Sequence, residues 1–303
     1  MKDTIIEAML CQTGSIKDLE KEGKAVETKF DGTRALIIKE NGQVTIQNRD
    51  GIDYSRRLPE LTGAAKIIKG DFIIDGEIIY VNPATGRVEF TPSQRRCATT
   101  DLGMIYFLKA KYPVQYAVFD ILKVGSKIVV DEPYLERKEL LRRLVPPRDD
   151  FVQYVPYRFD LRQAWEEVLA AGDEGLVLKD VNSRYVHRRS YTWLKLKNWR
   201  EAVYDVVGYT EGKGLRSLRF GALVLAENGV YRGLVGSGPN ETEMIAIWDR
   251  LQNSIQVVRP FDIGQPYTPV QSGLKVEVKF YKITEQGVMR WPVFLRVVTT
   301  SAR

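Results

Sequence analysis

The sequence has few of the side chains on which many enzymes and metal sites depend. Its 303 residues include one histidine, His187, and two cysteines, Cys11 and Cys97. These are too few for a zinc site of about four cysteine and histidine ligands, and too few for a disulfide framework. A Ser-His-Asp or Cys-His hydrolase is also disfavoured, because no serine or cysteine motif accompanies His187. Lysines, carboxylates and metal ions remain as the sources of chemistry.

Long apolar runs are also missing. No run of about 18 apolar residues occurs, which is the length that a membrane-spanning helix needs. The first residues, MKDTIIEAMLCQTGS, carry acids early and lack the apolar core of a signal peptide. We therefore expect a cytoplasmic protein with no membrane partner. The net charge of +6 suits a polyanionic partner without requiring one.

The first 199 residues predict an α+β domain built on antiparallel sheets. Alternating apolar and polar residues predict a series of hairpins from Lys24 to Gln47, with turns at Asp31-Gly32 and Asn41-Gly42. Other runs have strand or helix periodicity. The expected strands are 72–80, 114–122, 175–179 and 191–197, and the expected helices are 93–111, 134–144 and 161–171.

From residue 200 to 303 the pattern changes to short strands, which predict a second domain. The expected strands are 204–209, 221–226, 231–235 and 274–281, with one helix at 241–252. About five strands in about 100 residues fit a small closed barrel, with the OB-fold as the leading candidate. We place the domains at residues 1–199 and 200–303.

Several strands of the first domain carry charged residues among large apolar ones. Unpaired burial of such a charge costs several kcal/mol, and this cost is better explained by a ligand than by stability. Lys29 lies beside the Asp31-Gly32 turn and shares a strand face with Glu27. The other charges of this kind are Asp75, Glu77, Glu174, Lys195 and Lys197.

This mixture of charges indicates the ligand. Carboxylates without histidine or thiolate partners favour Mg²⁺ or Mn²⁺, and clustered lysines favour phosphate. Phe119 could stack on a base, although it could equally be a core residue. A lysine crowded by cations can become a nucleophile, whereas Lys29 taken alone would be an ordinary exposed lysine. Together these features imply nucleotidyl transfer with displacement of pyrophosphate.

Five motifs, KFDGTR, DGEIIY, YAVFDIL, EGLVLK and WLKLK, occur in the order and approximate spacing of the covalent nucleotidyltransferase superfamily. The chain as a whole resembles a small two-domain ATP-dependent DNA ligase. The segments EGKGLRSLRFGALVL and GLVGSG resemble the start of a ligase OB domain, and ITEQGVMRWPVFLR resembles the family's final motif. The resemblance implies an antiparallel-sheet, ATP-grasp-like adenylation domain followed by an OB-fold.

The resemblance also implies roles for residues of the nucleotide pocket. Lys29 would be the adenylated nucleophile, Glu27 would recognise the adenine amino group, and Phe119 would stack on adenine. Glu77 would contact the ribose and the metal, and Glu174 would also bind the metal. ATP would be the AMP donor, with Mg²⁺ or Mn²⁺ as the cation. NAD is not expected as the donor, because too few residues precede Lys29 for a nicotinamide-recognising domain.

Further basic residues would act on the phosphates of ATP. Lys195 and Lys197 would hold the α-phosphate and stabilise charge as the leaving group departs. Arg290 and Arg296 of the final motif would orient the pyrophosphate. The family usually has another arginine two positions after Arg296 and then Asp-Lys, whereas this chain has Val298 followed by TTSAR. Either self-adenylation depends more on Arg290 and Arg296, or Arg303 substitutes.

Nicked double-stranded DNA is the expected partner, bound by a monomer. The resemblance places Arg34 near the sugar or the DNA end and Arg49 at the 5′-phosphate of the nick. Basic clusters outside the pocket would add sequence-independent, salt-sensitive phosphate contacts, although about half of them would be ordinary solvated residues. The predicted contacts in these clusters are Arg188, Lys213, Arg216 and Arg219.

Nick sealing through a lysyl-AMP and a DNA-adenylate is therefore the leading hypothesis. Within the same superfamily, an RNA ligase or a GTP-dependent capping guanylyltransferase is the alternative. A non-catalytic, OB-containing nucleic-acid-binding protein with a dead nucleotide pocket is the alternative from another class. The motif residues Lys29, Glu77 and Glu174 are all intact, which argues against a decayed pocket.

Overall fold

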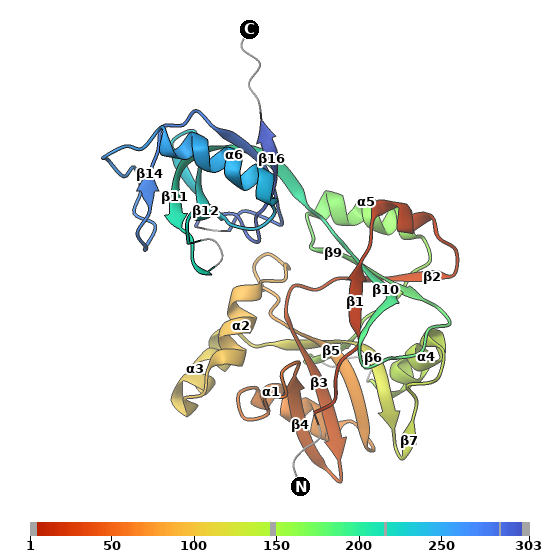
Figure 1. The fold of residues 1–303 in the computed structure, drawn as a ribbon. Coiled ribbons are helices and arrows are strands. Elements are labelled where there is room, and N and C mark those ends of the chain that lie inside the picture. Colours follow the sequence, from red (N-terminus) through yellow and green to blue (C-terminus); the bar gives the residue numbers. More distant parts are fainter. Residues whose placement is uncertain (1–4, 146–149, 215–216, 285, 299–303) are drawn as a thin grey trace. The chain divides into compact units, whose positions relative to one another are not determined.

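The computed structural model describes residues 5–145, 150–214, 217–284 and 286–298. The chain divides into two compact units, residues 1–197 and 198–303 (Figure 1), and we describe each by itself. Within the described ranges, no helix has the length and apolarity needed to cross a membrane.

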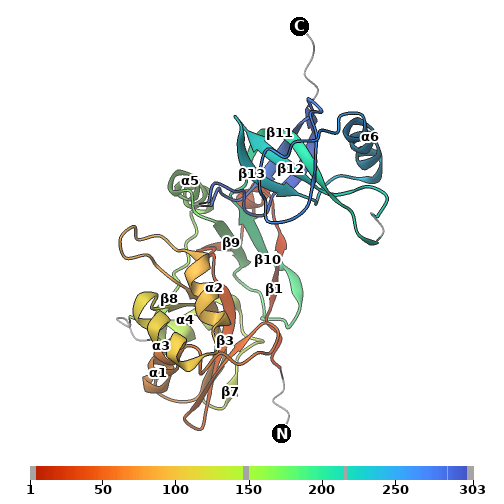
Figure 2. The same ribbon diagram turned by 90° about the vertical axis from the view of Figure 1, so that its left-hand side faces the viewer.

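The described part of the first unit contains two sheets. One has the strand order β1-β10-β9-β2, and Figure 2 shows β1, β10 and β9 running together. Strand β1 is parallel to β10, and the other neighbours are antiparallel. The strands are β1 (Leu10–Thr13), β10 (Arg189–Lys197), β9 (Gly175–Asp180) and β2 (Lys24–Thr28).

The second sheet of this unit has the order β4-β3-β5-β6-β7, with β8 beside β6. All its neighbours are antiparallel except β6 and β8. The strands are β4 (Gln43–Asn48), β3 (Thr33–Glu40), β5 (Phe72–Ile79), β6 (Gln115–Val124), β7 (Lys127–Ile128) and β8 (Val152–Tyr154).

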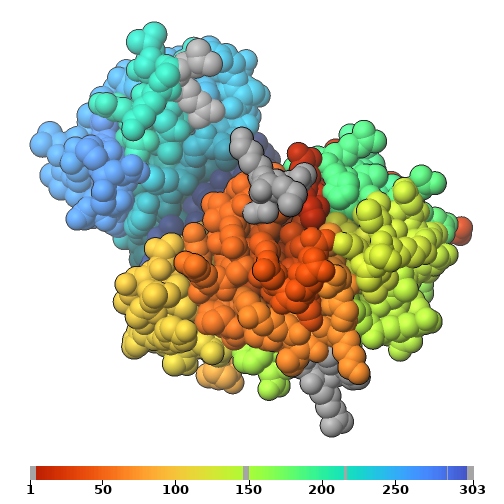
Figure 3. All heavy atoms as spheres, turned by 90° about the horizontal axis from the view of Figure 1, so that it is seen from below, coloured from red at the N-terminus to blue at the C-terminus, as the bar shows by residue number. Residues whose placement is uncertain are grey.

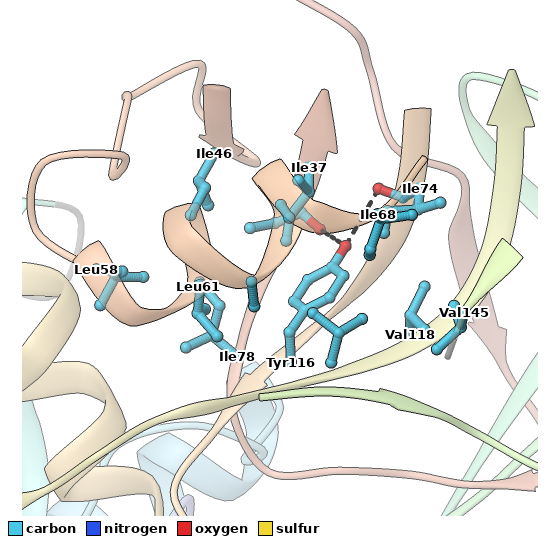
Figure 4. Packing of buried hydrophobic residues seen from close by; sticks show 14 of the residues in the cluster. Ile37, Ile46, Leu58, Leu61, Ile68, Ile74, Ile78, Tyr116, Val118 and Val145 are labelled. Atoms are coloured by element: carbon cyan, nitrogen blue, oxygen red, sulfur yellow. Dashed lines mark hydrogen bonds between the residues drawn. The ribbon is translucent and has the colours of Figure 1, made fainter. Parts of the chain in front are cut away.

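Helices cover these sheets and complete the main core. The aliphatic face of the second sheet packs against helix α1, and Tyr116 reaches into this core (Figure 4). The Tyr116 hydroxyl bonds to the carbonyls of Ala35 at 2.8 Å and Ile74 at 3.1 Å, so its polar end is satisfied although the ring is buried. The helices are η1 (Ile16–Glu20), α1 (Pro59–Ile67), α2 (Phe90–Ala98), α3 (Leu102–Lys111), α4 (Tyr134–Leu144) and α5 (Leu161–Ala171).

The prediction of one helix over residues 93–111 is wrong, because the segment forms two helices. Helix α2 ends at Ala98, and Asp101 caps α3 by accepting a hydrogen bond from the Met104 amide at 2.8 Å. Helix α3 lies at the outside of the unit (gold in Figure 3), where Leu102 and Tyr106 are exposed. Asp101 is a common N-cap residue, and the stretch Thr99-Thr100-Asp101 marks the start of the second helix.

The predicted hairpin at Asn41-Gly42 is confirmed, but the one at Asp31-Gly32 is wrong. Strand β2 pairs with β9, and β3 pairs with β4 and β5, so the chain passes from one sheet to the other between Thr28 and Thr33. Gly32 makes this passage possible, because a Cβ there would lie 2.3 Å from the Ile78 carbonyl oxygen. Alternation identified both strands but not their partners.

In its described residues, the second unit is an antiparallel sheet with one helix. Its sheet order is β13-β12-β11-β15-β16, with the short β14 beside β11. Helix α6 (Glu241–Gln252) buries Met244, Ile247 and Leu251 in the core of this unit. The strands are β11 (Arg200–Glu211), β12 (Phe220–Glu227), β13 (Val230–Val235), β14 (Thr268–Pro269), β15 (Lys275–Phe280) and β16 (Val293–Val298).

Candidate active site

Lys29 lies directly after β2, and it is held by β9, the strand that pairs with β2. Its backbone N–H donates to the Gly175 carbonyl at 3.0 Å, and its Nζ forms an ion pair with Glu174 Oε1 at 2.7 Å. The side chain of Glu174 is only 2% exposed, whereas that of Lys29 is 20% exposed. The lysine amine is therefore held by a buried carboxylate and still reaches solvent.

Glu174 has coordinating capacity left over. Its Oε2 is buried and has no hydrogen-bond partner among the described residues. Burial raises the pKa of Glu174, and the charge of Lys29 acts in the opposite direction. A buried carboxylate oxygen without a partner is costly unless a ligand completes its contacts.

The two lysines of strand β10 lie beside this pair. In the antiparallel register Lys197 is opposite Gly175, and Lys195 is opposite Val177. Burial lowers the pKa of Lys197, and the neighbouring charge of Lys29 lowers it further. The predicted gathering of Lys29, Glu174, Lys195 and Lys197 is thus present in the structure.

Glu77 reaches the same cluster from the second sheet. It lies on β5 opposite Arg34 of β3. Burial raises the pKa of Glu77 to about 8, although Lys29 and Arg34 oppose this rise, and Glu174 adds to it. The two sheets therefore bring Glu77 and Glu174 close enough to repel each other when both are ionised.

The raised pKa of Glu77 predicts that the stability of the folded protein depends on pH. The folded-state pKa of Glu77 lies above its ordinary value of 4.5, so the unfolded chain ionises first as the pH rises. Stability is then lost between about pH 4.5 and pH 8. We expect Glu77→Gln to be more stable than the wild type at pH 8 by about 2 kcal/mol, and by much less at pH 5.

Urea unfolding at pH 5, 6.5 and 8 in metal-free buffer measures this effect. Glu22→Gln is the matched control, since Glu22 is an exposed carboxylate outside the cluster. A stability margin for Glu77→Gln that is the same at all three pH values would contradict the prediction.

Arg34 is held by a buried network. Its guanidinium forms a two-pronged ion pair with Asp75, with Nε donating to Oδ1 at 3.0 Å, and the Tyr185 hydroxyl donates to Asp75 Oδ2 at 2.7 Å. The guanidinium also lies 5.2 Å from the centre of the Phe119 ring. Asp75 thus fixes Arg34 and Arg34 contacts Phe119, two links that the sequence did not reveal.

Glu27 is buried and surrounded by donors that sequence reasoning missed. Lys138 contacts its Oε1 at 2.7 Å, Tyr134 donates to the same oxygen at 2.6 Å, and Lys179 contacts Oε2 at 2.6 Å. Lys138 and Tyr134 belong to α4, whose sequence YLERKELLRRL is typical of an ordinary amphipathic helix. No sequence signal distinguished this buried lysine from a surface one.

Of the predicted DNA contacts of the first unit, Arg34 is mostly buried, whereas Arg49 and Arg188 are at the surface. Arg49 is exposed directly after β4, and Asn48 shapes the turn by accepting bonds from the amides of Asp50 and Ile52. Arg188 is exposed directly before β10. Both are accessible to a polyanion.

The second unit carries the remaining predicted residues. Lys213 is exposed, and Arg219 pairs with Glu241 at 2.6 Å, whereas Arg216 lies outside the described residues. Arg290 lies 4.2 Å from the centre of the Trp291 ring. Arg296 is exposed and pairs with Glu277 at 2.6 Å.

Cation binding would need ligands from outside the protein. Across the described part of the chain, no group of three or more histidine, cysteine or acidic side chains is arranged to hold a metal ion. Glu77 and Glu174 are two carboxylates, and Mg²⁺ commonly takes one or two carboxylates together with substrate phosphates and water.

The chain matches a family model and curated relatives. Residues 8–197 match the model for the ATP dependent DNA ligase domain. Over 298 residues the chain is 29% identical to the multifunctional non-homologous end joining protein LigD of Mycolicibacterium smegmatis, covering 94% of this chain and 37% of that protein. A DNA ligase of Ignicoccus hospitalis is 30% identical, covering 81% of this chain and 44% of that protein. The chain thus spans less than half the length of either relative.

Solved structures have a related architecture. The ligase domain of LigD from M. tuberculosis aligns with a TM-score of 0.57 at 25% identity, covering 97% of this chain and 95% of that chain. A Lig E DNA ligase aligns with a TM-score of 0.69 at 22% identity, covering 97% of this chain and the whole of that one. The latter likeness shows the fold alone.

Proposed function

Because the chain belongs to the family of ATP-dependent DNA ligases, we propose that it transfers AMP from ATP to Lys29 and uses this adduct to seal nicks in duplex DNA. The observation that carries the proposal is the pairing of the solvent-reaching Lys29 amine with the buried Glu174, beside Lys195, Lys197 and Glu77. An amine, two carboxylates and two further cations form a site for phosphoryl chemistry on a nucleotide.

The reaction has three steps. Lys29 Nζ attacks the α-phosphorus of ATP, forming a nitrogen–phosphorus bond as pyrophosphate leaves. The AMP group then passes to the 5′-phosphate of the nick, and finally the 3′-hydroxyl displaces AMP. Glu174 Oε1, 2.7 Å from the amine, is placed to accept the proton that Lys29 loses in the first step.

The remaining pocket residues position the nucleotide. Lys195 and Lys197 hold the α-phosphate, and their charge stabilises the transition state. Glu77 and the partnerless Oε2 of Glu174 fit a Mg²⁺ or Mn²⁺ ion, which would neutralise phosphate charge when bound. Phe119 stacks on adenine, and Glu27 accepts a hydrogen bond from its amino group.

We assign residues 1–199 to adenylation and residues 200–303 to an OB-fold domain. The five-stranded antiparallel path of β11 to β16 supports this assignment, as does the bond from the Phe294 amide to the Ser237 carbonyl at 2.9 Å, which joins β16 to the segment after β13. Arg290 and Arg296 orient the pyrophosphate. With Val298 in place of the usual arginine, either these two residues carry more of that task or Arg303, which lies outside the described residues, substitutes.

DNA binding uses basic residues of both units. Arg34 and Arg49 meet the nick, and Arg188, Lys213, Arg216 and Arg219 contact backbone phosphates. Such contacts are indifferent to sequence and weaken as salt rises, which suits a monomeric nick-sealing enzyme.

Sealing of a nicked duplex tests the proposal. We expect product with ATP and Mg²⁺ and none with NAD, because the family uses ATP. GTP in place of ATP tests the capping alternative, and nicked RNA in place of nicked DNA tests the RNA-ligase alternative. A protein that binds nicked DNA but forms neither lysyl-AMP nor sealed product would instead be a non-catalytic binding protein.

A further inference from the structure

The protein holds the two carboxylate oxygens of Glu27 in different ways. Its side chain is 2% exposed and contacts two lysines and one tyrosine. An ionised carboxylate has about four lone-pair sites, two on each oxygen. Tyr134 donates to Oε1, and the Lys138 ammonium contacts the same oxygen at 2.7 Å. Lys179 lies 2.6 Å from Oε2, but its Nζ makes no hydrogen bond among the described residues. Oε2 is therefore the oxygen with acceptor capacity left.

Lys138 is held in place by the oxygen acceptors around its ammonium group. It is fully buried, and its three N–H donors match three acceptors: Glu27 Oε1 at 2.7 Å, the Val155 carbonyl at 2.6 Å and the Phe119 carbonyl at 3.4 Å. One ammonium group thus joins the carboxylate of Glu27 to the backbone of Phe119. These are the two residues assigned to the base, one for its amino group and one for its ring.

Lys179 is held differently. Its Nζ lies 4.0 Å from the centre of the Trp193 ring and 4.6 Å from that of Phe119, besides the contact with Glu27 Oε2. Aromatic faces accept a cation without supplying a directional hydrogen bond. The Oε1 side of Glu27 is therefore clamped by directed bonds, and the Oε2 side is set less rigidly.

We propose that Lys138 and Tyr134 are positioning residues for base selection, which rests on the proposed function of this site. They clamp Oε1 of Glu27 and leave Oε2 to accept a hydrogen bond from the 6-amino group of adenine. Lys138 also holds Phe119 at a fixed position relative to Glu27. The hydrogen bond to Glu27 and the stacking on Phe119 then act on the same base.

A comparison of two nucleoside triphosphates distinguishes this role from a purely structural one. ATP carries the 6-amino group, and purine riboside triphosphate lacks it but keeps the same ring. We expect wild-type protein to form its lysyl-nucleotide about 30-fold more efficiently with ATP, as kcat/KM, because one hydrogen bond to a charged acceptor is lost.

Tyr134→Phe and Lys138→Met are expected to reduce this preference to about 5-fold or less, mainly through a higher KM for ATP. Lys138→Arg keeps the charge and should retain more of the preference than Lys138→Met. Tyr157→Phe is the matched control, since Tyr157 packs against the Tyr134 ring at 6.1 Å without an observed bond to Glu27. It should keep the wild-type preference.

Three outcomes decide between the possibilities. A wild-type protein that takes no label from ATP overturns the proposed function and this inference together. A wild type labelled equally by both triphosphates overturns base reading by Glu27. Equal losses with both triphosphates in Tyr134→Phe, or an unchanged preference in that variant, overturn the positioning role. Tyr134→Phe removes a single hydroxyl, so it remains informative if Lys138→Met does not fold.

Discussion

Lys29→Ala is expected to take up no label from α-³²P-ATP, a loss of at least about 1,000-fold relative to the wild type. The first step forms a bond from the lysine nitrogen to phosphorus, and Lys29 supplies an amine paired with Glu174 at 2.7 Å. Labelled protein resolved on a denaturing gel measures the adduct directly, because a covalent bond survives denaturation.

Two further variants make the result specific. Lys29→Arg keeps a cation for Glu174, but a guanidinium does not lose its proton, so it should also remain unlabelled. Lys24→Ala removes a lysine of the same strand, which pairs with Asp180 at 3.0 Å outside the cluster, and should be labelled normally. Clear labelling of both Lys29 variants would move the nucleophile elsewhere and contradict the assigned site.

The residues of this cluster could be predicted from the sequence, but their contacts could not. Charges set in apolar strands identified Lys29, Glu77, Glu174, Lys195 and Lys197. The pairing of Lys29 with Glu174 depends on β2 lying beside β9, strands separated by about 145 residues. Alternation of apolar and polar residues specifies which face is buried, and it does not specify which strand is the neighbour.

Buried polar partners were the hardest features to predict. Lys138 lies in a charged helical segment, and helix periodicity is compatible with exposure there, yet its side chain is fully buried. Its burial follows from the three acceptors that the surrounding strands and loop supply. Only the tertiary structure brings those oxygens together, so a single sequence contains no local sign of them.

Gly175 is the residue where fold and site depend on each other most closely. Its φ is +147°, and a Cβ would lie 1.9 Å from the Leu196 carbonyl oxygen of β10. The Gly175 carbonyl also accepts the Lys29 amide at 3.0 Å. Strands β9 and β10 can approach this closely only because position 175 has no side chain, which gives the glycine of the EGLVLK motif a physical reason.

Gly175→Ala is therefore expected to destabilise the protein by about 4 kcal/mol or more, because the backbone of β10 must move and the torsion is unfavourable for alanine. The same movement would displace Glu174 and Lys197 from Lys29. Labelling by ATP should therefore fall even at urea concentrations at which the variant is still folded. Urea unfolding and α-³²P-ATP labelling at low denaturant measure the two effects separately.

Gly23→Ala is the matched control for the backbone torsion. Gly23 has a φ of +67°, but a Cβ there would meet nothing within 4 Å. It should cost only about 1 kcal/mol, the penalty of a left-handed conformation, and should leave labelling intact. If Gly175→Ala were no more destabilising than Gly23→Ala, the close approach of β9 and β10 would not be what positions Glu174. The Lys29 amine would then owe its place to the pairing of β2 with β9 alone.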